Sequence, residues 1–85
     1  MRRNRKAGQR LRQLRKELNL SLRDVYEKSK KLALRNRNPD FRLLPSRLSE
    51  IECRGIVPNI YRLCSLANAY GIPMKKLLAL YDLEG

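Results

Sequence analysis

The amino-acid sequence predicts an all-α fold in which five short helices enclose one modest core. Apolar residues recur at intervals of three and four along most of the chain, and this spacing places them on one face of a helix. Runs that alternate apolar and polar residues between turn signals, which would indicate strands, do not stand out. The 85 residues, of which 42% are hydrophobic, suffice for a single domain.

The first helix is expected over residues 7–18, where three leucines fall on one face. Leu11, Leu14 and Leu18 are spaced i, i+3 and i+7, so all three should turn toward the core. Asn19 follows directly. Because asparagine tolerates left-handed backbone geometry, it offers the chain a place to end the helix.

A second helix should begin after Ser21, a residue type that caps helix N-termini. Asp24 stands three residues later, where its carboxylate can reach back to the backbone of the cap. We expect this helix to end near Leu34. Its buried side should consist of Val25, Ser29 and Leu32.

An unusually long connection should separate the second helix from the third. Residues 35–40 are polar and rich in turn formers, and Asn36, Asn38 and Pro39 are expected to shape the turns. Three apolar residues follow that carry too much apolar surface to leave in water, so we expect the connection to be partly ordered. They are Phe41, Leu43 and Leu44.

The third helix is expected to begin at Pro45 or Ser46, because proline suits the first turn of a helix. Leu48 and Ile51 are its inward-facing residues, since their spacing of three places them on one side. Gly55 should end it, because glycine readily adopts the left-handed conformation that follows a helix.

The fourth helix should open at Pro58, with Asn59 as its cap, and end before Gly71. Its apolar stripe consists of Ile60, Leu63, Leu66, Ala67 and Tyr70. A fifth helix should open at Pro73. The residues that it offers for burial are Leu77, Leu78 and Tyr81. Five connected apolar faces of this kind make a compact helical domain.

The charge of the chain is strongly positive and unevenly distributed. Its 20 Lys and Arg residues against 8 Asp and Glu give a formal net charge of +12. Residues 1–38 hold 14 basic and three acidic residues, a balance of +11, whereas residues 39–85 hold six and five, a balance of +1. Such an excess favours a polyanionic partner, because contacts with phosphates release condensed counterions. The N-terminal half should therefore carry most of the attraction.

Several classes of function are disfavoured by composition. The chain has no histidine, no phosphate-binding glycine loop and no nucleophile beside a base, so we do not expect an enzyme or a cofactor. Cys53 and Cys64 alone cannot complete a structural zinc site, and we expect them to pack as small apolar residues. We expect no metal and no small-molecule ligand. No stretch is long and apolar enough to span a membrane, so a cytoplasmic location is the default expectation.

Three segments of the chain, in this order and spacing, resemble the phage-repressor and Cro type of helix-turn-helix protein, often called the XRE family. The resemblance covers residues 8–80. Its segments are Gly8–Arg15 continuing into Asn19–Val25, Leu48–Gly55, and Pro58–Leu63 continuing into Leu66–Ile72. It implies a five-helix, lambda-repressor-like domain over residues 7–85 that binds double-stranded DNA and regulates transcription in bacteria.

The resemblance also implies which side chains meet DNA. In this family the third helix enters the major groove and presents side chains from its first two turns. Carried onto this chain, the residues that would contact bases are Ser46, Arg47, Ser49 and Glu50. Arg54 and Asn59 fall at positions where the family typically touches phosphate.

The chain departs from the family in two places. About ten residues separate Leu34 from Pro45, where the family usually has a tight turn of about three or four. Leu22 also occupies the position at which the family often has a phosphate-binding glutamine. The side chains that could replace that contact are Arg23 and the connection's Arg35, Arg37 and Arg42.

Three of the four candidate base contacts have an alternative interpretation. Arg47 could bond O6 and N7 of a guanine together, or could be a solvated charge. Ser46 could bind a base or cap the third helix. Glu50 could accept a hydrogen bond from a cytosine amine or be repelled by nearby phosphates.

Residues 1–6 are expected to form a flexible basic arm. Arg2, Arg3 and Arg5 could lie in a minor groove, or the segment could be a disordered tail that adds only electrostatic attraction. The resemblance further implies a structural ion pair between Arg15 and Glu52. It also allows binding as a homodimer to paired half-sites.

Two other functions fit the same residues. One is an antitoxin or adaptor that uses this fold to hold a protein, through an apolar surface near residues 41–44 or residues 78–81. The other is a basic RNA-binding protein, which the charge alone would permit. A comparison of duplex DNA with RNA over a series of salt concentrations would separate these from DNA recognition.

Overall fold

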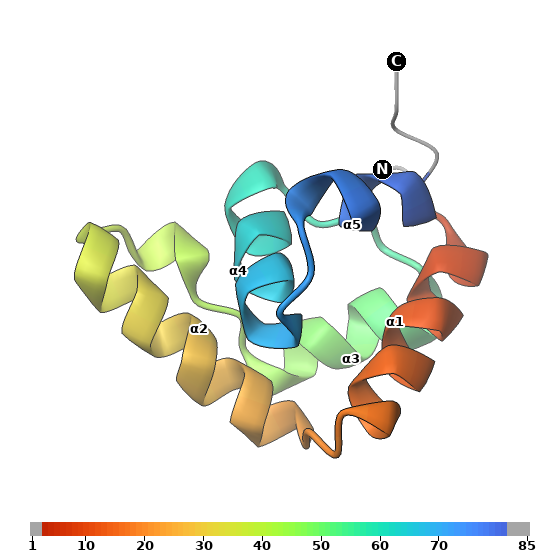
Figure 1. The fold of residues 1–85 in the computed structure, drawn as a ribbon, viewed down its shortest axis with the longest axis horizontal. Helices are drawn as coiled ribbons and strands as arrows, with labels where there is room; N and C mark the ends of the chain where they lie inside the picture. Colours follow the sequence, from red (N-terminus) through yellow and green to blue (C-terminus); the bar gives the residue numbers. More distant parts are fainter. Residues whose placement is uncertain (1–2, 82–85) are drawn as a thin grey trace.

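The computed structural model describes residues 3–81 and confirms the all-α prediction (Figure 1). Its elements are α1 (Arg5–Glu17), α2 (Leu22–Asn36), the short 3-10 helix η1 (Pro39–Phe41), α3 (Pro45–Arg54), α4 (Ile60–Tyr70) and α5 (Met74–Leu80). An isolated antiparallel bridge joins Arg3 to Ile56, and the described residues contain no longer strand.

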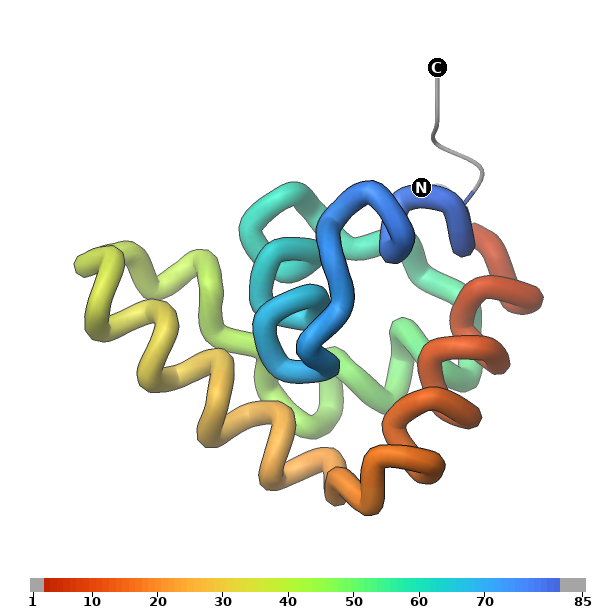
Figure 2. Tube along the Cα trace, viewed as in Figure 1, coloured from red at the N-terminus to blue at the C-terminus, as the bar shows by residue number. Residues whose placement is uncertain are grey.

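The helices pack around one core, to which every α-helix contributes. Helix α3 packs against both α1 and α2, and α4 packs against α2 and α5, as the traces in Figures 1 and 2 show. The largest apolar side chains that are fully buried come from the five α-helices and the connection between α2 and α3. They are Leu11, Val25, Leu43, Leu48, Ile51, Leu66 and Leu77. Burial of this apolar set is what holds α3 against the body.

Helix α1 begins at Arg5, two residues before the expected start. The reason is a cap that sequence analysis missed: Asn4 Oδ1 accepts a hydrogen bond from the Ala7 amide at 3.0 Å. The Asn4 amide in turn donates to the Gly55 carbonyl oxygen at 2.5 Å. Residues 3–6 are therefore held in place, unlike the flexible arm that we expected, while Arg2 lies outside the described residues.

The end of α1 corrects one core assignment. Asn19 has a φ of 57°, which confirms the left-handed turn expected there. Because the helix already ends at Glu17, Leu18 serves as its C-cap and is 42% exposed, so the prediction that it faces the core is wrong. Leu14, by contrast, is partly buried against the core as expected.

Helix α2 begins with the capping box that the sequence predicts. Ser21 Oγ accepts from the Asp24 amide at 3.0 Å, and Asp24 Oδ2 accepts from the Ser21 amide at 2.8 Å. Val25 and Ser29 are buried as expected, whereas Ala33 takes the third buried place and Leu32 is only half-buried. The helix ends at Asn36, two residues later than expected.

The capping box should make the stability of the protein depend on pH. Its hydrogen bonds from Ser21 lower the pKa of Asp24, so the unfolded chain binds the proton more readily. The contribution is complete above the unfolded pKa, about 3.9, and is lost as the pH falls through the folded value. Asp24→Asn should therefore lower the melting temperature near neutral pH, and this difference should shrink below about pH 4.

Thermal unfolding followed by circular dichroism from neutral to acidic pH measures this difference. A gap between wild type and Asp24→Asn that stays constant across the series would show that the charge of Asp24 does not act through the box.

The connection between α2 and α3, residues 37–44, is ordered, as predicted. Asn38 Oδ1 accepts from the Asp40 amide at 2.9 Å and so caps η1. The Leu43 amide donates to Ser29 Oγ at 2.9 Å, and the Leu43 side chain is fully buried.

Helix η1 is held against α4 by an aromatic contact and a hydrogen bond. The rings of Phe41 and Tyr61 meet edge to face with their centroids 5.3 Å apart, and Ser65 Oγ donates to the Phe41 carbonyl oxygen. Leu44 does not dock. It is 51% exposed, which corrects the expectation that it packs with Phe41 and Leu43.

Two glycines set the spacing of α1 and α3. A Cβ at Gly8 would lie 2.5 Å from the Ile51 carbonyl oxygen, so only glycine lets the two helices cross this closely. Gly55 ends α3 as predicted, with a φ of +71°.

The predicted cap of α4 also forms, since Asn59 Oδ1 accepts from the Arg62 amide at 2.9 Å.

The C-terminal helices follow the predicted pattern with one correction. Ile60 is 55% exposed because it lies in the first turn of α4, away from the core, so its place in the apolar stripe is wrong. The other four stripe residues are buried. Gly71 adopts the left-handed conformation expected after α4, and in α5 and its cap the buried residues are Leu77 and Tyr81, with Leu78 half-buried.

Candidate nucleic-acid interface

Helix α3 presents a buried side and an open side. Leu48 and Ile51 are fully buried, whereas Ser46 and Arg47, in the first turn, are exposed. The guanidinium of Arg47 forms no ion pair within residues 3–81. An exposed, unpaired arginine at the start of such a helix can donate two parallel hydrogen bonds to a pair of acceptor atoms on a binding partner.

Ser46 does not cap α3. The N-cap residue is Leu44, which supplies no side-chain hydrogen bond, and Pro45 occupies the first helical position. The alternative that Ser46 caps α3 is therefore wrong. Ser49 and Glu50 are half-buried, so they offer less surface to a partner than Ser46 and Arg47 do.

Three of the six expected phosphate contacts belong to three different helices or their caps. Arg23 is exposed in the first turn of α2, and Arg54 is exposed in the last turn of α3. Asn59 is exposed, but its side-chain oxygen is already engaged in capping α4. By capping α4, Asn59 orders the N-terminus of that helix. The free backbone amides and the helix dipole at this end favour an anion.

The structure groups only two of the three arginines that we expected on the connection, because Arg35 lies in α2. Arg35, Arg37 and Arg42 are all exposed. Arg37, which adopts a φ of 52°, and Arg42 line the same hollow beside the end of α2, whereas Arg35 does not line it.

Arg15 and Glu52, the pair implied by the resemblance, join α1 to α3. Arg15 Nε donates to Glu52 Oε2 at 2.7 Å, and Arg15 Nη2 donates to Glu52 Oε1 at 2.9 Å. Both residues are buried, and Arg15 Nη1 also donates to the Leu20 carbonyl oxygen at 2.8 Å. The bonds to Glu52 raise the pKa of Arg15 above its ordinary value. This two-bonded pair fixes the orientation of α3 relative to α1.

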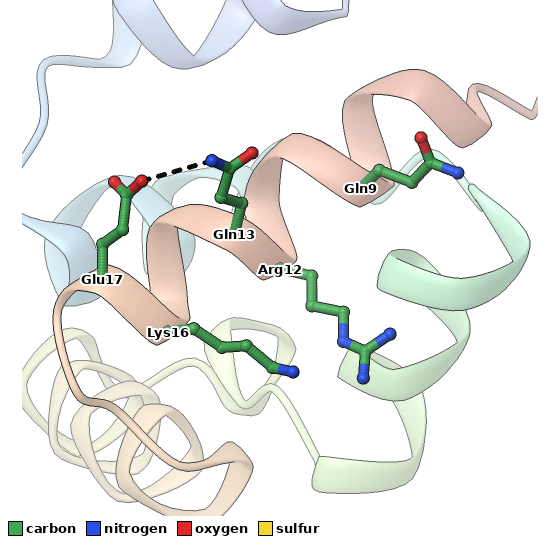
Figure 3. A pocket seen from close by; sticks show the side chains of 5 residues that line it. All are labelled: Gln9, Arg12, Gln13, Lys16 and Glu17. Atoms are coloured by element: carbon green, nitrogen blue, oxygen red, sulfur yellow. Dashed lines mark hydrogen bonds between the residues drawn. The ribbon is translucent and has the colours of Figure 1, made fainter.

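Helix α1 adds basic side chains that sequence analysis did not assign to a site. Gln9, Arg12, Gln13, Lys16 and Glu17 line a shallow hollow of about 550 Å³ along this helix (Figure 3). Figure 3 shows Arg12 and Lys16 extending to one side of α1, while Gln13 donates to Glu17 on the other at 3.3 Å. The i, i+4 spacing of Arg12 and Lys16 was the signal available in the sequence.

The two cysteines are unpaired thiols, and Cys53 is exposed, so the expectation that it packs as a small apolar residue is wrong. Cys64 is half-buried. Across residues 3–81 no three metal-ligating side chains gather closely enough to hold an ion. None of the helices in this range has the length and hydropathy needed to cross a membrane.

Comparison with known proteins identifies the family. Residues 8–83 match the family model described as a helix-turn-helix domain. The chain matches no curated protein, and it matches no solved structure. The matched span includes all of α2, the connection and α3, on which the candidate interface lies. This chain belongs to the helix-turn-helix domain family.

Proposed function

We propose that the protein is a sequence-specific double-stranded DNA-binding regulator of the phage-repressor and Cro type, and that α3 reads the major groove. Membership of the helix-turn-helix family supports DNA as the partner. A helix with one side packed into the core and its first turn exposed suits entry into a groove that admits an α-helix. The buried side chains of Leu48 and Ile51 keep one side of α3 against the core, so that the opposite side stays exposed.

The observation that carries this proposal is the position of Arg47. Its guanidinium is exposed in the first turn of α3 and has no ion-pair partner within the described residues. Arginine can donate two parallel hydrogen bonds to O6 and N7 of guanine, which is the commonest specific base contact. Ser46, also exposed and not engaged in capping, would contact a neighbouring base or phosphate.

Positive charge around α3 would position the helix on the phosphates. Arg23 and Arg54 would contact the backbone on either side of the bases that α3 reads, and the N-terminus of α4 behind Asn59 would accept a further phosphate. Arg12 and Lys16 would add to the field along α1. These contacts supply affinity but carry no sequence information by themselves.

Selection of bound sites from a random duplex pool tests the proposal directly. Arg47→Ala should then weaken binding to the selected site far more than to random duplex, because losing a two-bonded base contact costs about 1–3 kcal/mol of discrimination. The symmetry of the selected site reports whether two copies read paired half-sites.

Lys75→Ala is the matched control, since it removes one exposed positive charge on α5. It should weaken binding to both duplexes equally and only slightly. Equal losses for Arg47→Ala on the two duplexes would reassign Arg47 to phosphate contact. Recovery of no enriched site, together with equal or tighter binding to RNA over a salt series, would replace DNA reading by RNA binding.

A further inference from the structure

The last turns of α2 and the connection after it enclose a hollow of about 310 Å³. Its apolar lining is provided by Ala33, Leu34 and Pro39. Leu34 is 72% exposed, more than any other large apolar side chain in residues 3–81. Packing of the core does not require a leucine at this exposed position. An exposed apolar side chain beside a concave apolar surface is typical of a binding site.

Three basic side chains surround this apolar lining. They are Lys30 on α2 together with Arg37 and Arg42 on the connection. Among the described residues that line the hollow there is no Asp or Glu, and Asp40, although it belongs to η1, lies outside the lining. The hollow therefore combines an apolar centre with a positive rim.

The hollow is built from backbone that is already fixed. The Arg37 amide donates to the Leu34 carbonyl oxygen at 3.3 Å, and the Asn38 amide donates to the Ala33 carbonyl oxygen at 3.0 Å. Phe41, the last residue of η1, packs against Tyr61 of α4. A partner would therefore pay little to order this surface, which favours binding.

We propose that this hollow binds an acidic segment of a partner protein that carries an apolar side chain. The apolar side chain would enter against Leu34, Ala33 and Pro39, and carboxylates beside it would accept hydrogen bonds from Arg37 and Arg42. A DNA phosphate would satisfy the two arginines but would leave Leu34 in water. The apolar centre is therefore what selects a peptide over a nucleic acid.

The position of the hollow separates this inference from DNA reading. None of its lining residues belongs to α3, so the segment and a DNA site could be held at the same time. The inference does not rest on the proposed function, because it depends only on the apolar lining and the charged rim.

The test uses the whole 85-residue protein labelled with 15N, and a panel of short fluorescein-labelled peptides. Each peptide carries one leucine, isoleucine or phenylalanine between aspartates and glutamates, and its matched control carries serine at that position. Peptides with the apolar residue should bind at least tenfold more tightly than their serine controls. Their amide shift changes should concentrate in residues 30–42.

Substitutions then assign the contact. Leu34→Ser should abolish the preference for the apolar peptide, whereas Leu18→Ser, at another exposed leucine, should leave it unchanged. Arg37→Gln should weaken binding severalfold and Arg35→Gln should not, since Arg35 does not line the hollow. No preference over the serine controls anywhere in the panel, or a preference that survives Leu34→Ser, would overturn the proposal. So would a loss of duplex affinity in Arg37→Gln without any effect on the peptides, because the rim would then belong to DNA.

Discussion

Arg15→Met should lower the free energy of unfolding by about 3–5 kcal/mol, because it leaves the buried carboxylate of Glu52 without its partner. A charge that is removed from water and unpaired is costly, and the two hydrogen bonds at 2.7 and 2.9 Å are what offset that cost here. Adding Glu52→Leu should restore part of the lost stability, because two apolar side chains can fill the same space without a buried charge. The restoration should be incomplete, since the Leu20 carbonyl oxygen also loses its bond from Arg15.

Urea unfolding of wild type, both single variants and the double variant measures this coupling. Gln13→Met, on the exposed side of the same helix, is a suitable control and should change the free energy of unfolding little. If the two single variants each change the free energy of unfolding little and their effects add in the double variant, the pair is solvated. The burial of Arg15 and Glu52 would then have no energetic consequence.

Gly55→Ala should be destabilising by about 2–5 kcal/mol, because it combines two separate penalties. The φ of +71° costs a residue with a Cβ about 1–2 kcal/mol. In addition, the new Cβ would lie 2.5 Å from the Arg5 amide nitrogen and 2.6 Å from the Asn4 carbonyl carbon, so the start of α1 would have to move. That movement would also break the bond from the Asn4 amide to the Gly55 carbonyl oxygen.

Gly71→Ala supplies the control that separates the two penalties. Gly71 has a φ of +68°, nearly the same as Gly55, but nothing lies within 4 Å of a Cβ built there. It should therefore lose only about 1–2 kcal/mol. Equal losses for the two variants, measured by thermal and urea unfolding, would show that α1 yields to the added methyl group at Gly55 without cost.

The elements were predictable from the sequence where a local signal fixes them. The capping box of Ser21 and Asp24, the proline in the first turn of α3 and the glycine at its end act within a few residues. They need no knowledge of the rest of the chain. The resemblance to a known family placed Arg15 opposite Glu52, 37 residues away, which spacing alone would not have done.

The exposed apolar residues were not predictable in the same way. Leu18, Leu44 and Ile60 all carry helical or apolar signals, yet each is exposed. Leu18 and Leu44 are the caps just outside α1 and α3, and Ile60 is the first residue of α4, so all three lie at helix ends. Periodicity gives the face of a helix but not how far the neighbouring helices extend along it.

The candidate site was predictable only in part. The exposure of Arg47 and Ser46 followed from the prediction of the third helix and its inward residues, whereas their contact with DNA stays a prediction. The grouping of Arg37 and Arg42 around Leu34 depends on how the connection folds back along α2, which no local pattern in the sequence specifies. The i, i+4 spacing of Arg12 and Lys16 did not single out this pair, because basic residues are common throughout residues 1–38.

The connection between α2 and α3 packs on the body of the domain, and this packing limits how far the chain could be shortened by engineering. Its length suggests a loop that could be trimmed to a tight turn, but Leu43 is a core side chain and its amide is the partner of Ser29. A deletion there would open a cavity in the core and leave a buried hydroxyl with one bond fewer. The segment behaves as a sixth structural unit of the domain, and exposed residues such as Asp40 are the places where its sequence can be varied without disturbing the interior.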